Sequence, residues 1–144
     1  MQKEQTLMKI TKNKCCTYFR MVGNFDPEEI TERLGLLPFK SWKTGDLRKN
    51  GTSYDYSCWE YGLCNTYEVL IENQMRKTIF ELLDKADELN KIRNDYDVSF
   101  YLEIVPEIHV DDIAPVLNPS MEVIDFCHAT RTQIDFDYYL VNDQ

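Results

Sequence analysis

Residues 25–35, with the sequence FDPEEITERLG, restrict the fold of this chain more than any other segment, because they mark both ends of a helix. Asp26 can accept hydrogen bonds from the free amides of a first helical turn, and Pro27 suits the first helical position, where no amide donor is needed. Phe25 and Ile30 stand at the two positions of a hydrophobic staple. Gly35 is the residue type that most often ends a helix in a left-handed conformation. The segment therefore predicts a helix that begins after Asp26 and stops at Gly35.

Strands are predicted on both sides of this helix. Residues 15–24 alternate between two largely apolar faces, which is typical of a central strand that is covered on at least one side. A short strand is expected within residues 36–44, after Pro38, and a polar turn region over residues 45–53. Residues 54–62 are rich in aromatic side chains and predict a further strand.

A long amphipathic helix is predicted next, because apolar residues recur at spacings of three and four. These residues are Met75, Ile79, Leu82, Leu83, Ala86, Leu89 and Ile92. Residues 98–104 then alternate as a strand, which Pro106 is expected to break.

The C-terminal part predicts a short helix near residues 112–117, capped by Asp111 or Asp112, since Pro115 is tolerated only in a first turn. Two last strands, residues 121–127 and 132–141, are expected to pair through a turn. The element order predicts an α+β fold with a ferredoxin-like βαββαβ core, in which helices cover one face of an antiparallel sheet. A C-terminal helix and β-hairpin extend this core, and the first and fourth strands are expected to lie centrally.

The chain has 144 residues, the size of one ordinary domain. We expect residues 1–13 to be a polar N-terminal leader that is partly disordered, and residues 14–144 to form a single α+β domain. The net charge of −9 disfavours nucleic acid and membrane surfaces as partners. We expect a cytoplasmic protein, because there is no apolar signal segment and the odd number of cysteines argues against a disulfide framework.

Patterns that would indicate catalysis or a resident cofactor are missing from the sequence. Cys58 and Cys64 are six residues apart, which does not fit the ligand spacing of structural zinc. Cys127 and His128 are adjacent on a predicted strand, so their side chains are expected to point to opposite faces. Asp135 and Asp137 share a predicted strand face, which suits a metal or an acid–base pair but is also common on solvated strands. We therefore predict no catalytic residues, no metal and no cofactor.

One basic and aromatic region stands out in this acidic chain, and we take it as the candidate binding surface. Its residues are Lys40, Trp42, Lys43, Asp46, Arg48, Lys49, Tyr54, Tyr56, Trp59 and Tyr61. Stacked aromatic rings beside cations could clamp a nucleotide or an acidic peptide. The alternative is a solvated loop with Trp42 in the core, and burial in the core is also the expectation for Trp59.

Residues 22–38, VGNFDPEEITERLGLLP, resemble the opening signature of a bacterial family known as domain of unknown function 4279. That signature is a strand, a G-x-F-D-P-x-x-I helix start and an L-G-x-x-P exit. Residues 41–46, SWKTGD, are similar to a stretch of the family with a serine or threonine, a basic residue and K-G-D/E, and Trp59 stands where the family carries a tryptophan on the next strand. The resemblance implies no catalytic residues. Some relatives are thought to be small cytosolic proteins of the immunity or interaction kind, which implies a binding role.

These observations favour a non-enzymatic protein-binding domain, of an immunity-like kind, whose partner is another protein. The alternative is a small-ligand-binding domain or an uncatalogued enzyme with a pocket between the sheet and the helices. Homodimerisation through an edge strand is a third alternative.

Overall fold

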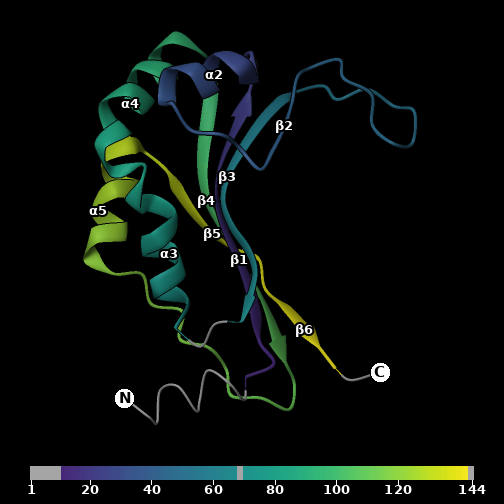
Figure 1. Cartoon of the computed structure of the whole chain (residues 1–144), viewed down its shortest axis with the longest axis vertical. Coiled ribbons are helices and arrows are strands. Elements are labelled where there is room, and N and C mark those ends of the chain that lie inside the picture. The colour runs from purple at the N-terminus through teal and green to yellow at the C-terminus, as the bar shows by residue number, and fades with distance from the viewer. Residues whose placement is uncertain (1–10, 68–69, 143–144) are drawn as a thin grey trace.

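The computed structural model describes residues 11–67 and 70–142, which form one mixed sheet with four α-helices (Figure 1). The strands are β1 (Lys14–Gly23), β2 (Lys40–Trp42), β3 (Ser57–Tyr67), β4 (Val98–His109), β5 (Gln133–Phe136) and β6 (Tyr139–Val141). The helices are α2 (Pro27–Leu34), α3 (Ile71–Phe80), α4 (Ala86–Asp95) and α5 (Met121–Thr130), and a 3-10 turn, η1 (Leu83–Lys85), precedes α4. None of these helices is long and apolar enough to cross a membrane. The predicted α+β class is confirmed.

The sheet runs in the order β2-β3-β1-β4-β5, and β6 pairs with β4 beyond the end of β5. The strand β1 is antiparallel to both β3 and β4, and β2 is antiparallel to β3. The last two strands pair with β4 in parallel, so the predicted all-antiparallel sheet is wrong at this edge. Both β1 and β4 are interior strands, as their apolar composition predicts.

All four helices cover one face of the sheet, and the opposite face carries no helix (Figure 1). Strand alternation assigns the side chains of β1 to these two faces, so that Phe19 and Met21 are fully buried under the helices while Tyr18 and Arg20 lie on the open face. Trp59 of β3 is also fully buried on the helix side, where its indole Nε1 donates to Thr31 Oγ1 of α2 at 3.0 Å. The core therefore lies between one sheet face and the helical layer.

The helix α2 forms as its sequence predicts. The Asp26 side chain accepts from the Glu28 amide at 3.0 Å, and Pro27 occupies the first turn. Gly35 ends the helix with a φ of 65° and donates its amide to Thr31 O at 2.8 Å. Local capping chemistry is thus sufficient to place this helix.

The predicted single long helix is wrong, because the chain breaks it into α3, η1 and α4. At the break Leu82 N donates to Ile79 O and Lys85 N donates to Leu82 O. Each bond joins residues three apart, so the chain winds into a tighter turn than an α-helix, whose bonds join residues four apart. Leu82 stays fully buried across the break. The two helices cover different parts of a twisted sheet (Figure 1), which one straight helix could not follow. No glycine or proline marks the break in the sequence.

The predicted break of β4 at Pro106 is also wrong, because the strand continues to His109. Ile104 O accepts from Asp137 N, and Val110 N donates to Val141 O, so the even-numbered residues of β4 direct their backbone groups toward β5 and β6. Pro106 belongs to this set, and it lies where β5 has ended and β6 has not begun. The missing donor therefore interrupts no pairing.

The C-terminal prediction fails at two further places. Residues 112–117 form no helix, and residues 121–127, predicted as a strand, belong to α5. Ser120 caps α5, since its hydroxyl accepts from the Val123 amide. The buried side chains of α5 recur at helical spacing and are Val123, Phe126, Cys127 and Thr130. The predicted hairpin is replaced by a helix that leads into parallel strands.

The end of the predicted leader is held against the loop that follows β4. Asn13 Oδ1 accepts from the His109 amide at 2.7 Å, and Asn13 Nδ2 donates to Ile113 O at 2.7 Å. Asp112, expected to cap a helix, instead accepts from the Lys12 amide at 2.6 Å. Residues 1–10 of the leader lie outside the described residues.

Candidate functional site

The ten predicted binding residues do not form one surface, because strand alternation separates them. Trp59 and Tyr61 of β3 lie on the helix side of the sheet, Trp59 fully buried and Tyr61 half-buried. Lys40 and Trp42 lie on β2. The others belong to the connection between β2 and β3, residues 43–56, here called the β2–β3 arm; they are Lys43, Asp46, Arg48, Lys49, Tyr54 and Tyr56. The predicted cluster is therefore corrected to eight residues on the arm side and two on the helix side.

The β2–β3 arm is an irregular hairpin that projects from the body of the protein (Figure 1). Gly45 N donates to Tyr54 O at 2.8 Å, and Tyr54 N donates to Asp46 O at 2.9 Å. The Asp46 carboxylate accepts from the Lys43 amide at 2.8 Å, so this residue shapes a turn. At the base of the arm the Thr44 amide donates to Ser57 Oγ at 3.0 Å. The arm thus holds its shape through its own backbone.

Two stacked aromatic rings on the arm and β2 lie between two cations. The rings of Trp42 and Tyr54 stack at 4.4 Å, and Tyr56 meets Trp42 edge-on at 5.6 Å. The Arg48 guanidinium lies 4.6 Å from the centre of the Tyr54 ring, and Lys40 Nζ lies 5.3 Å from that of Trp42. The buried indole nitrogen of Trp42 has no acceptor among the described residues. We call this group the aromatic–cation stack.

Charged residues continue from the stack across the open sheet face. Arg20 of β1 lies opposite Glu60 of β3, with Nε 3.3 Å from Glu60 Oε2. Arg20 also donates to the hydroxyl of Tyr56 at 3.4 Å. Burial raises the pKa of Glu60, while the nearby cations Arg20 and Lys40 lower it. The sequence predicts that Arg20 lies on a strand, but it does not reveal the pairing with Glu60, because cross-strand register is not visible in the sequence.

A second charged feature of this face is a pair of carboxyl groups. Glu103 of β4 lies in register with Asp135 of β5 and is buried. Burial, and then the hydrogen bond and charge of Asp135, raise the pKa of Glu103 to about 8. The predicted partner of Asp135 was Asp137, which instead accepts from the Tyr139 hydroxyl at 3.1 Å. Glu103 was not singled out from the sequence, since only parallel pairing brings it to Asp135.

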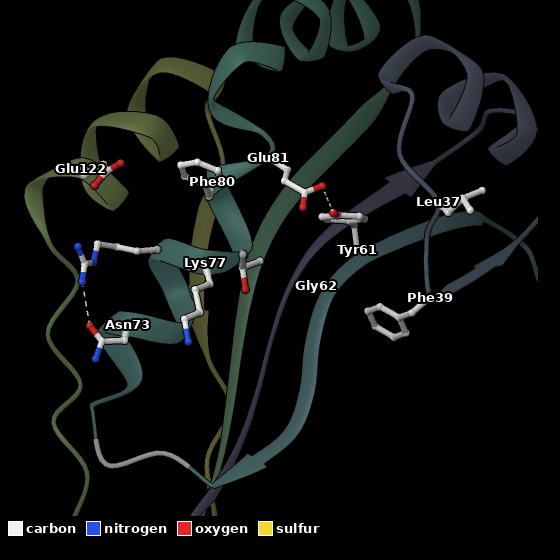
Figure 2. A pocket seen from close by; sticks show the side chains of 11 residues that line it. Leu37, Phe39, Tyr61, Gly62, Asn73, Lys77, Phe80, Glu81 and Glu122 are labelled. Atoms are coloured by element: carbon white, nitrogen blue, oxygen red, sulfur yellow. Dashed lines mark hydrogen bonds between the residues drawn. The ribbon is translucent and has the colours of Figure 1, made fainter. Parts of the chain in front are cut away.

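On the helix side, a groove of about 800 Å³ lies between α3 and the edge of the sheet (Figure 2). Leu37 and Phe39, which lead into β2, form one wall, and Phe80 is exposed on the side of α3. Tyr61 and Gly62 of β3 lie between these walls (Figure 2). The sequence predicts a pocket between sheet and helices as an alternative but assigns no residue to it. Of the residues that line this groove, Tyr61 belongs to the predicted binding surface.

Most polar groups that line the groove already have partners. Tyr61 donates to the Glu81 carboxylate at 2.5 Å, which together with burial raises the pKa of Tyr61 to about 12. Arg76 pairs with Glu72 at 2.9 Å. Lys77 extends into the groove and forms no ion pair or hydrogen bond with the described residues (Figure 2). The groove therefore offers one unpaired cation between apolar walls.

The remaining candidates for chemistry are separated by the fold. Cys127 and His128 lie on α5 rather than on a strand, with Cys127 buried and His128 exposed. Burial raises the pKa of Cys127 to about 12, which disfavours the thiolate that a nucleophile needs. Among the side chains that the structure describes, which exclude those of residues 63–69, no group of three or more histidine, cysteine or acidic residues could hold a metal ion.

Comparison with known proteins finds one match. The model of a family described as domain of unknown function (DUF4279) matches residues 13–141, which include the arm, the open sheet face and the groove. No curated protein and no solved structure matches the chain. The match agrees with the resemblance carried by residues 22–60.

Proposed function

Because the chain belongs to the family of domain of unknown function 4279, whose description assigns no activity, we propose a function from its geometry: a non-enzymatic protein-binding domain, of an immunity-like kind. Its interface is the aromatic–cation stack with the adjoining open sheet face. The observation that carries the proposal is the stack itself, in which Trp42 and Tyr54 are preordered beside Arg48 and Lys40. Tryptophan, tyrosine and arginine are enriched among the few residues that carry most of the binding free energy at protein interfaces.

The chemistry of the surface favours a protein over other partners. The net charge of −9 repels phosphate backbones and anionic lipid. Basic side chains nevertheless outnumber acidic ones between Lys40 and Tyr56, which suits an acidic patch on a protein. Cys58 and Cys127 are free thiols, which supports our proposal that the protein acts in the cytoplasm.

We also propose that the first four strands with α2, α3 and α4 form a ferredoxin-like core. The order β2-β3-β1-β4 with antiparallel neighbours supports this core. In each βαβ unit, β1-α2-β2 and β3-α3-α4-β4, the two strands are separated by one strand of the other unit, which is the split βαβ arrangement. The helix α5 and the strands β5 and β6 then extend that core.

The alternative, a small-ligand-binding domain or an uncatalogued enzyme, would use the groove between α3 and the sheet edge. That groove is only partly enclosed, and its Arg76 and Tyr61 side chains are already bonded to Glu72 and Glu81. The geometry gives less support to this alternative, because an enclosed pocket with convergent free polar groups is the usual form of a small-molecule site.

Photo-crosslinking in cells of the source organism tests the proposal. A photoreactive amino acid at position 49, in the arm, should form a protein adduct that the same group at position 91, on α4, does not form. The Trp42→Ala variant should bind the captured partner about 30-fold more weakly, the effect of losing one central interface residue. Tyr138→Ala, an exposed aromatic at the other edge of the sheet, is the matched control. Identical adducts from both positions, or unchanged affinity of Trp42→Ala, would rule the stack out as the interface.

A further inference from the structure

The strand β3 has an edge beside the groove that no other described segment pairs with. Its partner β2 pairs only with Cys58, Trp59 and Glu60, whereas β3 continues to Tyr67. Phe39 N donates to Glu60 O at 2.9 Å, which shows that Glu60 directs its backbone groups toward β2. Backbone direction repeats every second residue, so Gly62 directs its N–H and C=O to the same side, beyond the end of β2. Neither group has a partner on that side among the described residues.

This edge has the geometry that accepts an added strand. The free part of β3, residues 62–67, contains a β-bulge, because β1 pairs Thr17 with Leu63 but Cys15 with Thr66, so the regular edge available to an added strand is centred on Gly62. The exposed side of α3 lies next to it, with Asn73, Lys77 and Phe80 turned toward the groove (Figure 2). A segment that extends the line of β2 would pair with β3 through its backbone and place alternate side chains against α3.

Apolar side chains on both walls are available to such a segment. Leu37 is 81% exposed, Phe39 is 49% exposed and Phe80 is 71% exposed. The Phe39 ring also packs edge-on at 5.5 Å against Tyr18, which lies on the open face, so Phe39 reaches across the edge of the sheet next to Gly62. Burial of these side chains by an occupant would remove apolar surface from water, the main favourable term in association.

Charge defines the occupant further. The Arg76 side chain is already paired with Glu72, and Glu81 accepts from Tyr61. Lys77 remains unpaired among the described residues, although the chain carries nine more acidic than basic groups. Glu122, which also forms no ion pair with the described residues, lies on α5 at the far end of the groove (Figure 2). An acidic side chain on the occupant would complement Lys77.

We propose that the groove between the free edge of β3 and α3 binds an extended segment of a partner protein, which adds a strand beside Gly62, fills the walls with apolar side chains and places a carboxylate against Lys77. This site is separate from the aromatic–cation stack, which lies on the other side of the sheet, so it does not depend on the proposed function of the stack.

The test uses a phage-displayed library of random twelve-residue peptides, panned on the full-length protein. Selected peptides should alternate apolar and polar positions and include an acidic residue. Their affinity should fall about tenfold in Lys77→Glu and in the double variant Leu37→Ser, Phe80→Ser, whose changed side chains are exposed. The matched controls are Lys91→Glu and Ile113→Ser, exposed residues outside the groove. In hydrogen exchange, the Gly62 amide should become at least tenfold slower when the peptide is bound.

Each other outcome overturns the proposal in a recognisable way. Peptides that lose affinity in Trp42→Ala but not in Lys77→Glu would identify the stack as the only peptide site and would support the proposed function alone. A dimer of the protein without peptide in light scattering, dissociated by Lys77→Glu, would make a second copy the occupant. Failure to select any peptide, or unchanged exchange at Gly62, would show that the edge accepts no strand.

Discussion

Replacement of Glu103 by Gln should stabilise the protein at neutral pH and leave its stability at pH 4 nearly unchanged. Glu103 is only 7% exposed and lies in register with Asp135 on the open sheet face. Burial, then the hydrogen bond and charge of Asp135, and to a smaller extent Asp137, raise its pKa to about 8, while Arg20 acts in the opposite direction. Gln keeps a donor for Asp135 but cannot ionise.

The magnitude follows from the difference between the folded and unfolded pKa values. In the unfolded chain Glu103 returns to its ordinary pKa of 4.5, so between pH 4.5 and about pH 8 the folded protein keeps a proton that the unfolded chain has lost. The unfolded state binds fewer protons in this window, and the free energy of unfolding therefore falls as the pH rises. The fall is about 1.4 kcal/mol per pH unit, or about 3 kcal/mol between pH 4.5 and pH 7. Below pH 4.5 both states are protonated and this effect vanishes.

Urea unfolding of the wild type and of Glu103→Gln at pH 4 and pH 7 measures this effect. The change in free energy of unfolding caused by the substitution should be about 3 kcal/mol more favourable at pH 7 than at pH 4. Glu107→Gln, an exposed glutamate on the same strand, serves as the control and should show the same effect at both pH values within about 0.5 kcal/mol. If Glu103→Gln has an equal effect at both pH values, Glu103 is ionised at neutral pH and its pKa is not raised in the folded protein.

Three further substitutions test how the layers are joined. Gly62→Ala should lower the free energy of unfolding by about 3 kcal/mol, because an added Cβ would lie 2.4 Å from Thr17 O; an unchanged urea midpoint would contradict the close approach of β1 and β3. Gln74→Leu should cost about 2 kcal/mol in the same assay, because the Thr17 hydroxyl loses its acceptor at 2.6 Å in a buried site; a cost near zero would mean that this bond is not formed. Asp26→Ala should lower the free energy of unfolding by about 1 kcal/mol, since the Glu28 amide loses its cap. An unchanged midpoint of thermal unfolding would show that this cap does not stabilise the protein.

Features that depend on neighbours in the sequence were predictable from it. The helix α2 begins and ends where Asp26, Pro27 and Gly35 predict, because caps act within one turn. The alternation of Phe19 and Met21 with Tyr18 and Arg20 predicted two different faces of β1, and burial confirms them. Strand alternation is a local property of the backbone.

Features that depend on which strands are neighbours were not predictable. Pro106 should break a strand, yet it lies at the one interval of β4 where its missing donor faces the space between β5 and β6. The break after α3 carries no glycine or proline, because the twist of the sheet rather than the local sequence requires it. The helix α5 was mistaken for a strand, although Ser120 and the spacing of Val123, Phe126 and Cys127 are the signals that could have identified it.

The candidate sites show the same division. The basic and aromatic residues between Lys40 and Tyr56 stand out in the sequence because composition alone reveals them. Their separation from Trp59 and Tyr61, the pairing of Glu103 with Asp135, and the free edge at Gly62 beside Lys77 come only from the tertiary structure. The sequence by itself determined the capped helix, the two-faced strands and the charge of the chain, since these arise from contacts within a few residues. The tertiary structure decided strand order and register, because those are set by which distant segments bury their apolar faces together.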